Sequence, residues 1–221
     1  MILFLSISVR AESNNEARDL YFKSIKTSDD NERVELRKKI IEISPDSEYG
    51  LFSKAYLLVD DCGYHEDCSM RALDLYTDAI KINPTLTVAF ANRGVTYQML
   101  GKHYLAIDDF SEAIRLDSKF LLSYYNRSFS YFELKEYNLA LKDCNDALKI
   151  NPQFELALMI RPKIYDALEQ YDNVINDCTE SIRIYPKWAP AYELRAKAYK
   201  KLGLNAQAEK DEIMFERLKN K

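Results

Sequence analysis

Glycine, proline and histidine are scarce in this chain. Only 5 Gly, 6 Pro and 2 His occur among 221 residues. So little glycine and proline argues against a turn-rich β fold and against glycine-rich phosphate loops, and two histidines leave little material for histidine-centred catalysis. No apolar run approaches the roughly 18–20 residues of a membrane-spanning helix. We therefore expect no transmembrane span.

The chain also lacks an excess of positive charge and the short motifs of common enzymes. Its formal net charge is −4 and its pI is about 5.4, so it has no basic surplus to release phosphate counterions, and no nucleic-acid partner is expected. The sequence contains no G-x-S-x-G, P-loop, H-E-x-x-H or glycine-rich dinucleotide turn. We predict no catalytic residue, no cofactor and no enzymatic activity.

The N-terminal residues form a short apolar segment. Residues 1–9 read MILFLSISV and are followed by Arg10 and Ala11. This pattern is typical of the apolar core and cleavage site of a secretory signal, although it lacks a basic start and is short. We interpret residues 1–13 as a possible truncated signal, which slightly favours an exported, periplasmic or secreted protein over a cytoplasmic one. The alternative is an apolar strand or helix packed on the core.

Internal periodicity decides the fold class. Pro84, Pro152 and Pro186 follow a spacing of 34 residues or its multiple, and Pro45 lies 39 residues before Pro84, which indicates an insertion of five. Whole columns match at this period. The columns are Tyr97, Tyr131, Tyr165 and Tyr199; Leu100, Leu134, Leu168 and Leu202; Ala106, Ala140, Val174 and Ala208; and Ala79, Ala113, Ala147 and Ser181.

Each period contains two apolar faces at helical spacing. In residues 87–120 the first face includes Phe90, Gly94 and Tyr97, and the second includes Ala106 and Phe110. A lone helix pair cannot cover its own apolar surface, so neighbouring pairs must stack.

This pattern resembles the tetratricopeptide repeat, most clearly in residues 87–120. The resemblance implies an all-α, right-handed α-solenoid of stacked helix-turn-helix units. We place repeats at 48–86, 87–120, 121–154, 155–188 and 189–221, and a degenerate N-terminal helix pair at 14–47. The charged stretch from Glu209 to Lys219 predicts a C-terminal capping helix, since a terminal repeat needs a polar outer face.

Two charged columns recur with the same period. One consists of Arg93, Arg127, Arg161 and Arg195, and the other consists of Asp109, Asp143, Asp177 and Asp211. An arginine ladder could follow a phosphate backbone, but the matching aspartates favour ion pairs between helices. We therefore predict a structural role for both columns.

In such an array the first helix of each pair lines the concave face, and here its exposed positions are apolar and aromatic. Such a surface favours a partner-binding groove, although several of these residues could instead be half-buried against adjacent repeats or cover the N-terminal segment. The predicted partner-binding residues are Phe52, Tyr56, Asn92, Val95, Met99, Tyr125, Asn126, Phe129, Phe132, Met159 and Lys163.

The basic clamp that related co-chaperones use for acidic C-terminal peptides is absent. Asn92 matches its central asparagine, but the neighbouring clamp positions hold Phe52, Tyr56, Leu122 and Asn126, none of them basic. We therefore predict a non-catalytic adaptor or scaffold that binds an apolar or amphipathic peptide segment of another protein. Self-association through the same groove is an alternative.

The five-residue insertion carries Cys62, His65 and Cys68. Three interpretations remain open: a disulfide between Cys62 and Cys68, two free thiols, or a zinc site at C-x2-H-x2-C spacing. We predict no metal, because three ligands on one short loop are weak evidence. The chain could nevertheless be a redox- or metal-responsive adaptor.

Pro162 falls where a small residue belongs inside a predicted helix. Proline removes one backbone hydrogen bond there and clashes with the preceding turn. A kink at this position would widen the groove near Met159 and Lys163.

Overall fold

The computed structural model describes residues 2–63 and 65–219, with side chains from Ala11 onward, and in this part of the chain it contains helices and no strands. None of the helices it describes combines the length and the apolar character needed to cross a membrane. The helices are α1 (Ile2–Lys26), α2 (Asp30–Ile43), α3 (Glu48–Cys62), α4 (Glu66–Ile82), α5 (Thr87–Met99), α6 (His103–Leu116), α7 (Leu121–Glu133), α8 (Tyr137–Ile150), α9 (Glu155–Ala167), α10 (Tyr171–Ile184), α11 (Ala189–Lys201) and α12 (Asn205–Lys219).

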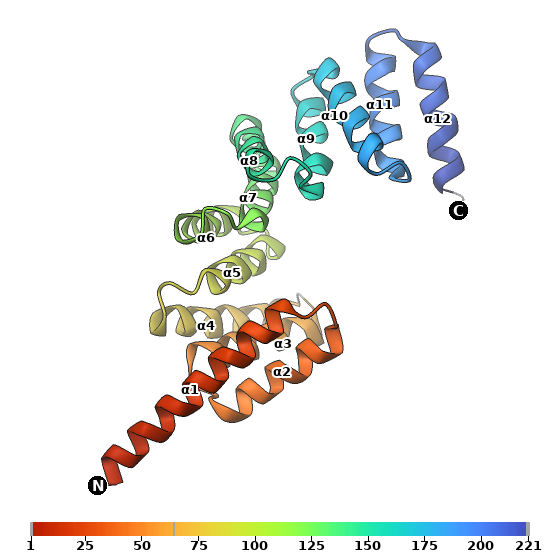
Figure 1. Ribbon diagram of the computed structural model, residues 1–221. Coiled ribbons are helices and arrows are strands. Elements are labelled where there is room, and N and C mark those ends of the chain that lie inside the picture. Colours follow the sequence, from red (N-terminus) through yellow and green to blue (C-terminus); the bar gives the residue numbers. More distant parts are fainter. Residues whose placement is uncertain (1, 64, 220–221) are drawn as a thin grey trace. The chain divides into compact units, whose positions relative to one another are not determined.

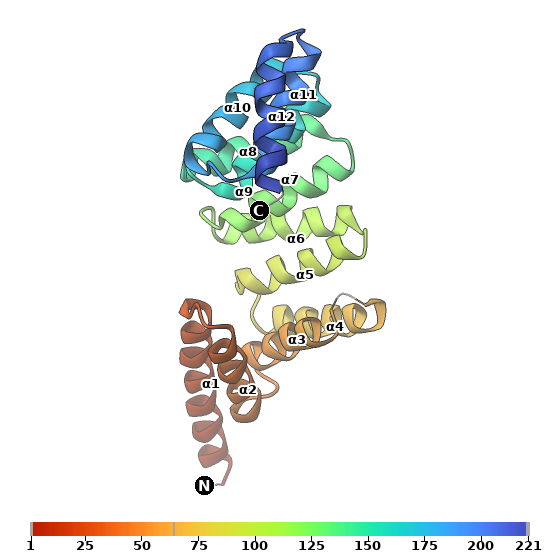
Figure 2. The ribbon, with the colours of Figure 1, turned by 90° about the vertical axis from the view of Figure 1, so that its right-hand side faces the viewer.

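The chain divides into two compact units (Figures 1 and 2). Unit 1 comprises residues 1–117 with helices α1 to α6, and unit 2 comprises residues 118–221 with helices α7 to α12. Within each unit every helix packs against the next one along the chain, and the short turns reverse the chain direction each time. The prediction of an all-α array of stacked helix pairs is confirmed.

The predicted repeat ranges can be compared with the helices. Each range from 48–86 onward contains one helix pair. The N-terminal range 14–47 holds α2 and the second half of α1, which begins at Ile2. The last helix, α12, is mostly charged on its exposed surface, but it also exposes 62% of Ile213.

The turns inside the four repeats from 87–120 to 189–221 follow one design. The residue two positions after the first helix has a positive φ: 70° at Gly101 and 75° at Gly203, but also 63° at Lys135 and 57° at Glu169. Glycine adopts this left-handed conformation without steric cost. Lys135 and Glu169 hold it through the same backbone bonds, for example Glu136 N to Tyr131 O at 2.8 Å.

A small residue on the first helix faces a core residue on the second. Gly94 lies against Phe110, and an added Cβ would come within 2.8 Å of the Phe110 ring. In the next repeat the same two positions hold Ser128 and Cys144, whose oxygen and sulfur are 3.0 Å apart. A larger residue on one helix is thus accompanied by a smaller one on the other, as close packing requires.

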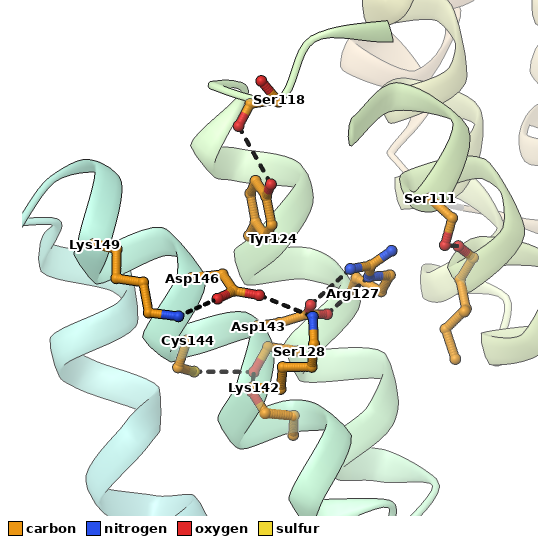
Figure 3. Close-up of polar contacts among 12 residues, drawn as sticks. Ser111, Ser118, Tyr124, Arg127, Ser128, Lys142, Asp143, Cys144, Asp146 and Lys149 are labelled. Carbon is orange, nitrogen blue, oxygen red and sulfur yellow. Dashed lines mark hydrogen bonds and ion pairs between the residues drawn. The ribbon is translucent and has the colours of Figure 1, made fainter. Parts of the chain in front are cut away.

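The arginine and aspartate columns form ion pairs inside each helix pair. Arg127 donates from Nε and Nη2 to the two carboxylate oxygens of Asp143 at 2.8 and 2.7 Å (Figure 3). The same bidentate ion pair joins Arg93 to Asp109, Arg161 to Asp177 and Arg195 to Asp211. The structural role predicted for these columns is confirmed.

Three of these arginines also link one repeat to the preceding one. The Nη1 atom of Arg161 donates to Asn145 Oδ1 at 2.9 Å, and that of Arg195 donates to Thr179 Oγ1 at 2.9 Å. In unit 1, Arg93 makes the equivalent bond to Thr77 Oγ1 at 3.0 Å. Each guanidinium therefore joins three helices, with its charge neutralised by the aspartate.

Pro162 lies inside α9, which remains helical on both sides of it. The missing amide of Pro162 leaves the Leu158 carbonyl without its usual donor. The buried hydroxyl of Ser181 on α10 donates to this carbonyl at 3.2 Å. Ser181 is the one serine in a column of alanines, and it stands in the same repeat as the proline. The widening of the groove stays a prediction.

Candidate functional site on the first-helix faces

In each unit we call the surface formed by the first helices of its repeats the first-helix face. In unit 2 this face contains a pocket of about 240 Å³ between α7 and α9. Five predicted partner-binding residues line it: Tyr125, Phe129, Phe132, Met159 and Lys163. Glu133, Leu156 and Ile160 complete the lining.

The pocket rests on a packed apolar floor. Ile160 and Ile164 of α9 are buried together with Ala140 and Cys144 of α8, and Tyr125, Phe129 and Phe132 pack against this cluster. Their rings are half-buried, so each contributes to the core on one side and to the pocket on the other. Burial also raises the pKa of the Tyr125 hydroxyl further above physiological pH.

The charges of the pocket lie at its edge. Glu133 is the last residue of α7, and Lys163 lies in the last turn and a half of α9; both side chains are exposed. No ion pair joins either of them to another residue in the described part of unit 2. Asn126 is half-buried on α7 but outside the pocket lining.

Unit 1 has a second cavity, of about 320 Å³, on its first-helix face. It is lined by Tyr56, Val59, Asp60, Gly63, Tyr76, Asn92 and Thr96. Two of the predicted residues, Tyr56 and Asn92, therefore lie together. The Asn92 amide donates to the Val88 carbonyl at 2.8 Å, so its side chain is oriented within α5 and its oxygen remains available as an acceptor.

Three other predicted residues of unit 1 lie outside this cavity. Val95 is half-buried, and Met99 is 56% exposed at the end of α5. Phe52 is only 2% exposed, with its ring 5.7 Å from that of Tyr21 and 5.6 Å from that of Tyr76. Phe52 is therefore a core residue that offers no surface to a partner, because the N-terminal helix pair covers it.

Sequence reasoning missed Arg37, which covers Phe52. Its guanidinium carbon lies 4.0 Å from the Tyr56 ring centre and 4.9 Å from that of Phe52. The side chain is 3% exposed, and burial lowers the pKa of Arg37. The repeat spacing could have revealed it, since the core column of Tyr76, Phe110 and Cys144 reaches Arg37 when extended back by 39 residues.

The cysteines fall into two classes. Cys62 and Cys68 form a disulfide between the end of α3 and the start of α4, and a sulfur in that bond is not a thiolate ligand for zinc. Within residues 2–63 and 65–219 no three His, Cys, Asp or Glu side chains are grouped to hold a metal. Cys144 and Cys178 are buried free thiols, and burial raises the pKa of each to about 12.

Models of the tetratricopeptide repeat match two adjacent segments, residues 87–120 and residues 122–154. These are the helix pairs α5–α6 and α7–α8. No curated protein matches this sequence.

Solved structures of tetratricopeptide-repeat proteins share the fold. PilF of Pseudomonas aeruginosa is 14% identical with a TM-score of 0.74, and the match covers 95% of this chain and 93% of that one. YrrB, described as having an unusual peptide-binding site, is 18% identical with a TM-score of 0.68 over 84% of this chain and 93% of its own.

A third solved structure contains a bound peptide. It is the first repeat domain of Spaghetti in complex with the HSP90 peptide SRMEEVD. It is 26% identical with a TM-score of 0.51, over 55% of this chain and 92% of that one. Residues 87–154 are therefore tetratricopeptide repeats, and the stacked helix pairs of the chain have the fold of tetratricopeptide-repeat proteins.

Proposed function

We propose that this protein is a non-catalytic interaction scaffold that binds an apolar or amphipathic peptide segment of another protein in the unit 2 pocket. The observation that carries the proposal is the convergence of Tyr125, Phe129, Phe132 and Met159 on one open hollow. Aromatic residues and methionine are enriched at the centres of protein interfaces.

The size of the pocket fits one large side chain. An apolar cavity of about 150 Å³ is enough to bind benzene, and the unit 2 pocket measures about 240 Å³. A bulky aliphatic or aromatic residue of a partner could therefore insert between α7 and α9. Met159 has a flexible side chain that can adapt to the shape of the inserted group.

The structural relatives support peptide binding in general terms. YrrB and Spaghetti are described with peptide sites, and an equivalent use of this chain is part of our proposal. An acidic C-terminal tail is a poor candidate, since Asn92 has no basic residue among its neighbouring clamp positions. The pocket favours burial of an apolar anchor, which contributes about 25 cal/mol per Å² of surface removed from water.

A matched pair of variants tests the proposal. Met159→Asp places a charge in the pocket, and Leu139→Asp places the same charge at a 44% exposed position of α8. Both proteins would be used as bait in lysate of the source organism, after circular dichroism and thermal unfolding have verified their folds. We expect partners that are lost with Met159→Asp and kept with Leu139→Asp. Capture of the same partner proteins by both variants would contradict the proposal.

The disulfide favours a second candidate, a redox-responsive adaptor. The disulfide between Cys62 and Cys68 closes the turn after α3. The unit 1 cavity is lined by Asp60 and Gly63, which lie on either side of Cys62 in the sequence. Reduction would release this turn and alter the cavity wall. If partner capture is the same with and without a dithiol reductant, and with Cys62→Ser/Cys68→Ser, this role is excluded.

Self-association of the protein stays a further prediction. Measuring its mass in solution at several protein concentrations tests it.

A further inference from the structure

The unit 2 pocket is asymmetric in charge. Because α8 reverses the chain between them, α7 and α9 run in the same direction, and their last turns lie at the same end of the pocket. Glu133 occupies this end on α7 and Lys163 on α9. At the opposite end the lining is apolar, with Leu156 near the start of α9.

The two charges are available to a ligand. Both side chains are exposed, and no ion pair within unit 2 uses either of them in the described structure. Their position contrasts with that of Lys197 on the next first helix, which is paired with Glu193 at 2.6 Å. The pocket therefore presents an apolar hollow with one unpaired negative and one unpaired positive group at one end.

Resting on the proposed function, we infer the chemistry of the segment that the pocket accepts. It is an amphipathic segment with one bulky apolar side chain that inserts between Phe129 and Met159. Beside this anchor the segment carries an acidic residue that pairs with Lys163 and a basic residue that pairs with Glu133. The apolar anchor supplies most of the affinity, and the two charges select the partner and its orientation.

Edge charges have a limited effect on affinity. Exposed ion pairs contribute little to binding free energy, and removal of one weakens binding by about two- to five-fold. Their effect is stronger on partner choice, because a like charge placed opposite is repelled. A charge reversal at Lys163 should therefore change which peptides bind, rather than abolish binding.

A displayed library of random 12-residue peptides tests this inference. It would be selected in parallel against the full-length protein, Lys163→Glu, Glu133→Lys and Met159→Asp at low salt. With the native protein we expect peptides with a bulky apolar residue flanked by an acidic and a basic residue. With Lys163→Glu the acidic position should become basic, and with Glu133→Lys the basic position should become acidic. Synthetic native-selected peptides should bind Lys163→Glu about two- to five-fold more weakly.

The outcomes separate the two proposals. If native-selected peptides bind Met159→Asp as well as the native protein, the pocket is not the binding site and the proposed function fails. If they need Met159 but their charges are random, or are unchanged by the reversals, the proposed function stands and the charge inference is wrong. A difference in affinity between the native protein and Lys163→Glu that stays the same in 0.5 M salt would also contradict it, because exposed ion pairs are screened at that ionic strength.

Discussion

At the scale of single residues, the serine in the alanine column compensates for the proline in the neighbouring helix. The hydroxyl of Ser181 is the donor that reaches the Leu158 carbonyl, which Pro162 cannot serve. Alanine at position 181 would fit sterically, since it occurs at this position in three other repeats. Loss of the hydroxyl alone would leave a buried carbonyl without a donor.

We therefore expect Ser181→Ala to reduce the free energy of unfolding by about 1–3 kcal/mol. In a Pro162→Ala background the restored amide serves Leu158, and the same change should reduce it by less than about 1 kcal/mol. Urea unfolding of the two single variants and the double variant measures this coupling. Equal losses in both backgrounds would mean that the hydroxyl does not compensate for the proline.

A second residue-scale prediction concerns the small and large partners in the core. Gly94→Ser places atoms where the Phe110 ring lies and should reduce the free energy of unfolding by about 1–3 kcal/mol through overpacking. Adding Phe110→Cys recreates the pair found at Ser128 and Cys144. The double variant should lose less stability than the sum of the single losses in chemical denaturation, whereas strict additivity would refute the packing argument.

The third prediction concerns thiol reactivity. Cys144 and Cys178 are buried with pKa values raised to about 12, and the thiolate is the reactive form. At pH 8 a thiol reagent should find no fast-reacting thiol in the native protein. Denaturant should release two thiols, and denaturant after reduction should release all 4 cysteines. Four thiols without reduction would show that Cys62 and Cys68 are not joined in the purified protein.

At the scale of the helices, the ion pairs between the arginine and aspartate columns hold the second helix of a repeat against the first. Arg127 and Asp143 have side chains that are 15% and 2% exposed. Arg127→Met would leave Asp143 buried without its partner and should reduce the free energy of unfolding by about 3–5 kcal/mol. Arg127→Met with Asp143→Leu should recover much of this loss, because no unpaired charge then remains.

The exposed pair on α11 is the control for this measurement. Glu193 and Lys197 are 42% and 62% exposed, and Lys197→Met should change the free energy of unfolding by less than about 1 kcal/mol. Equal effects at Arg127 and Lys197 in urea unfolding would show that burial does not set the strength of these ion pairs.

The helices and the ion pairs between the two columns were predictable because both depend on local, repeated spacing. A period of 34 residues fixes which residues share a helix face, and therefore which side chains meet inside each pair. The same logic placed Tyr125, Phe129 and Met159 on one surface. It failed at Phe52, because the core column reaches Arg37 in the degenerate N-terminal repeat, and a charged side chain is not expected at a buried core position.

Other features depend on contacts that periodicity does not encode. The spacing of Cys62 and Cys68 allowed a disulfide, free thiols or a metal site, and only the closeness of the two helix ends distinguishes them. The hydrogen bond between Ser181 and Leu158 joins residues that are 23 positions apart, and the presence of Pro162 alone does not predict it. The unpaired charges of Glu133 and Lys163 likewise become visible only once every neighbouring ion pair is known.

At the scale of the whole molecule, the repeat establishes the fold but leaves the partner open. Tetratricopeptide repeats serve as protein-interaction scaffolds, and each presents a different set of exposed side chains on a common framework. In this chain the two units carry different first-helix faces. Unit 1 has a partly polar cavity with Tyr56, Asp60 and Asn92, whereas unit 2 has the apolar pocket.

The most direct test of the central claim is site-specific photo-crosslinking at the unit 2 pocket. Benzoylphenylalanine would replace Phe132 in the pocket or, as a control, Tyr171, a half-buried aromatic residue of α10 outside it. After irradiation in lysate of the source organism, mass spectrometry identifies the crosslinked peptides. We predict partner peptides with a bulky apolar residue that crosslink at position 132 and not at position 171. The same peptides at both positions, or crosslinks at position 171 alone, would contradict the account.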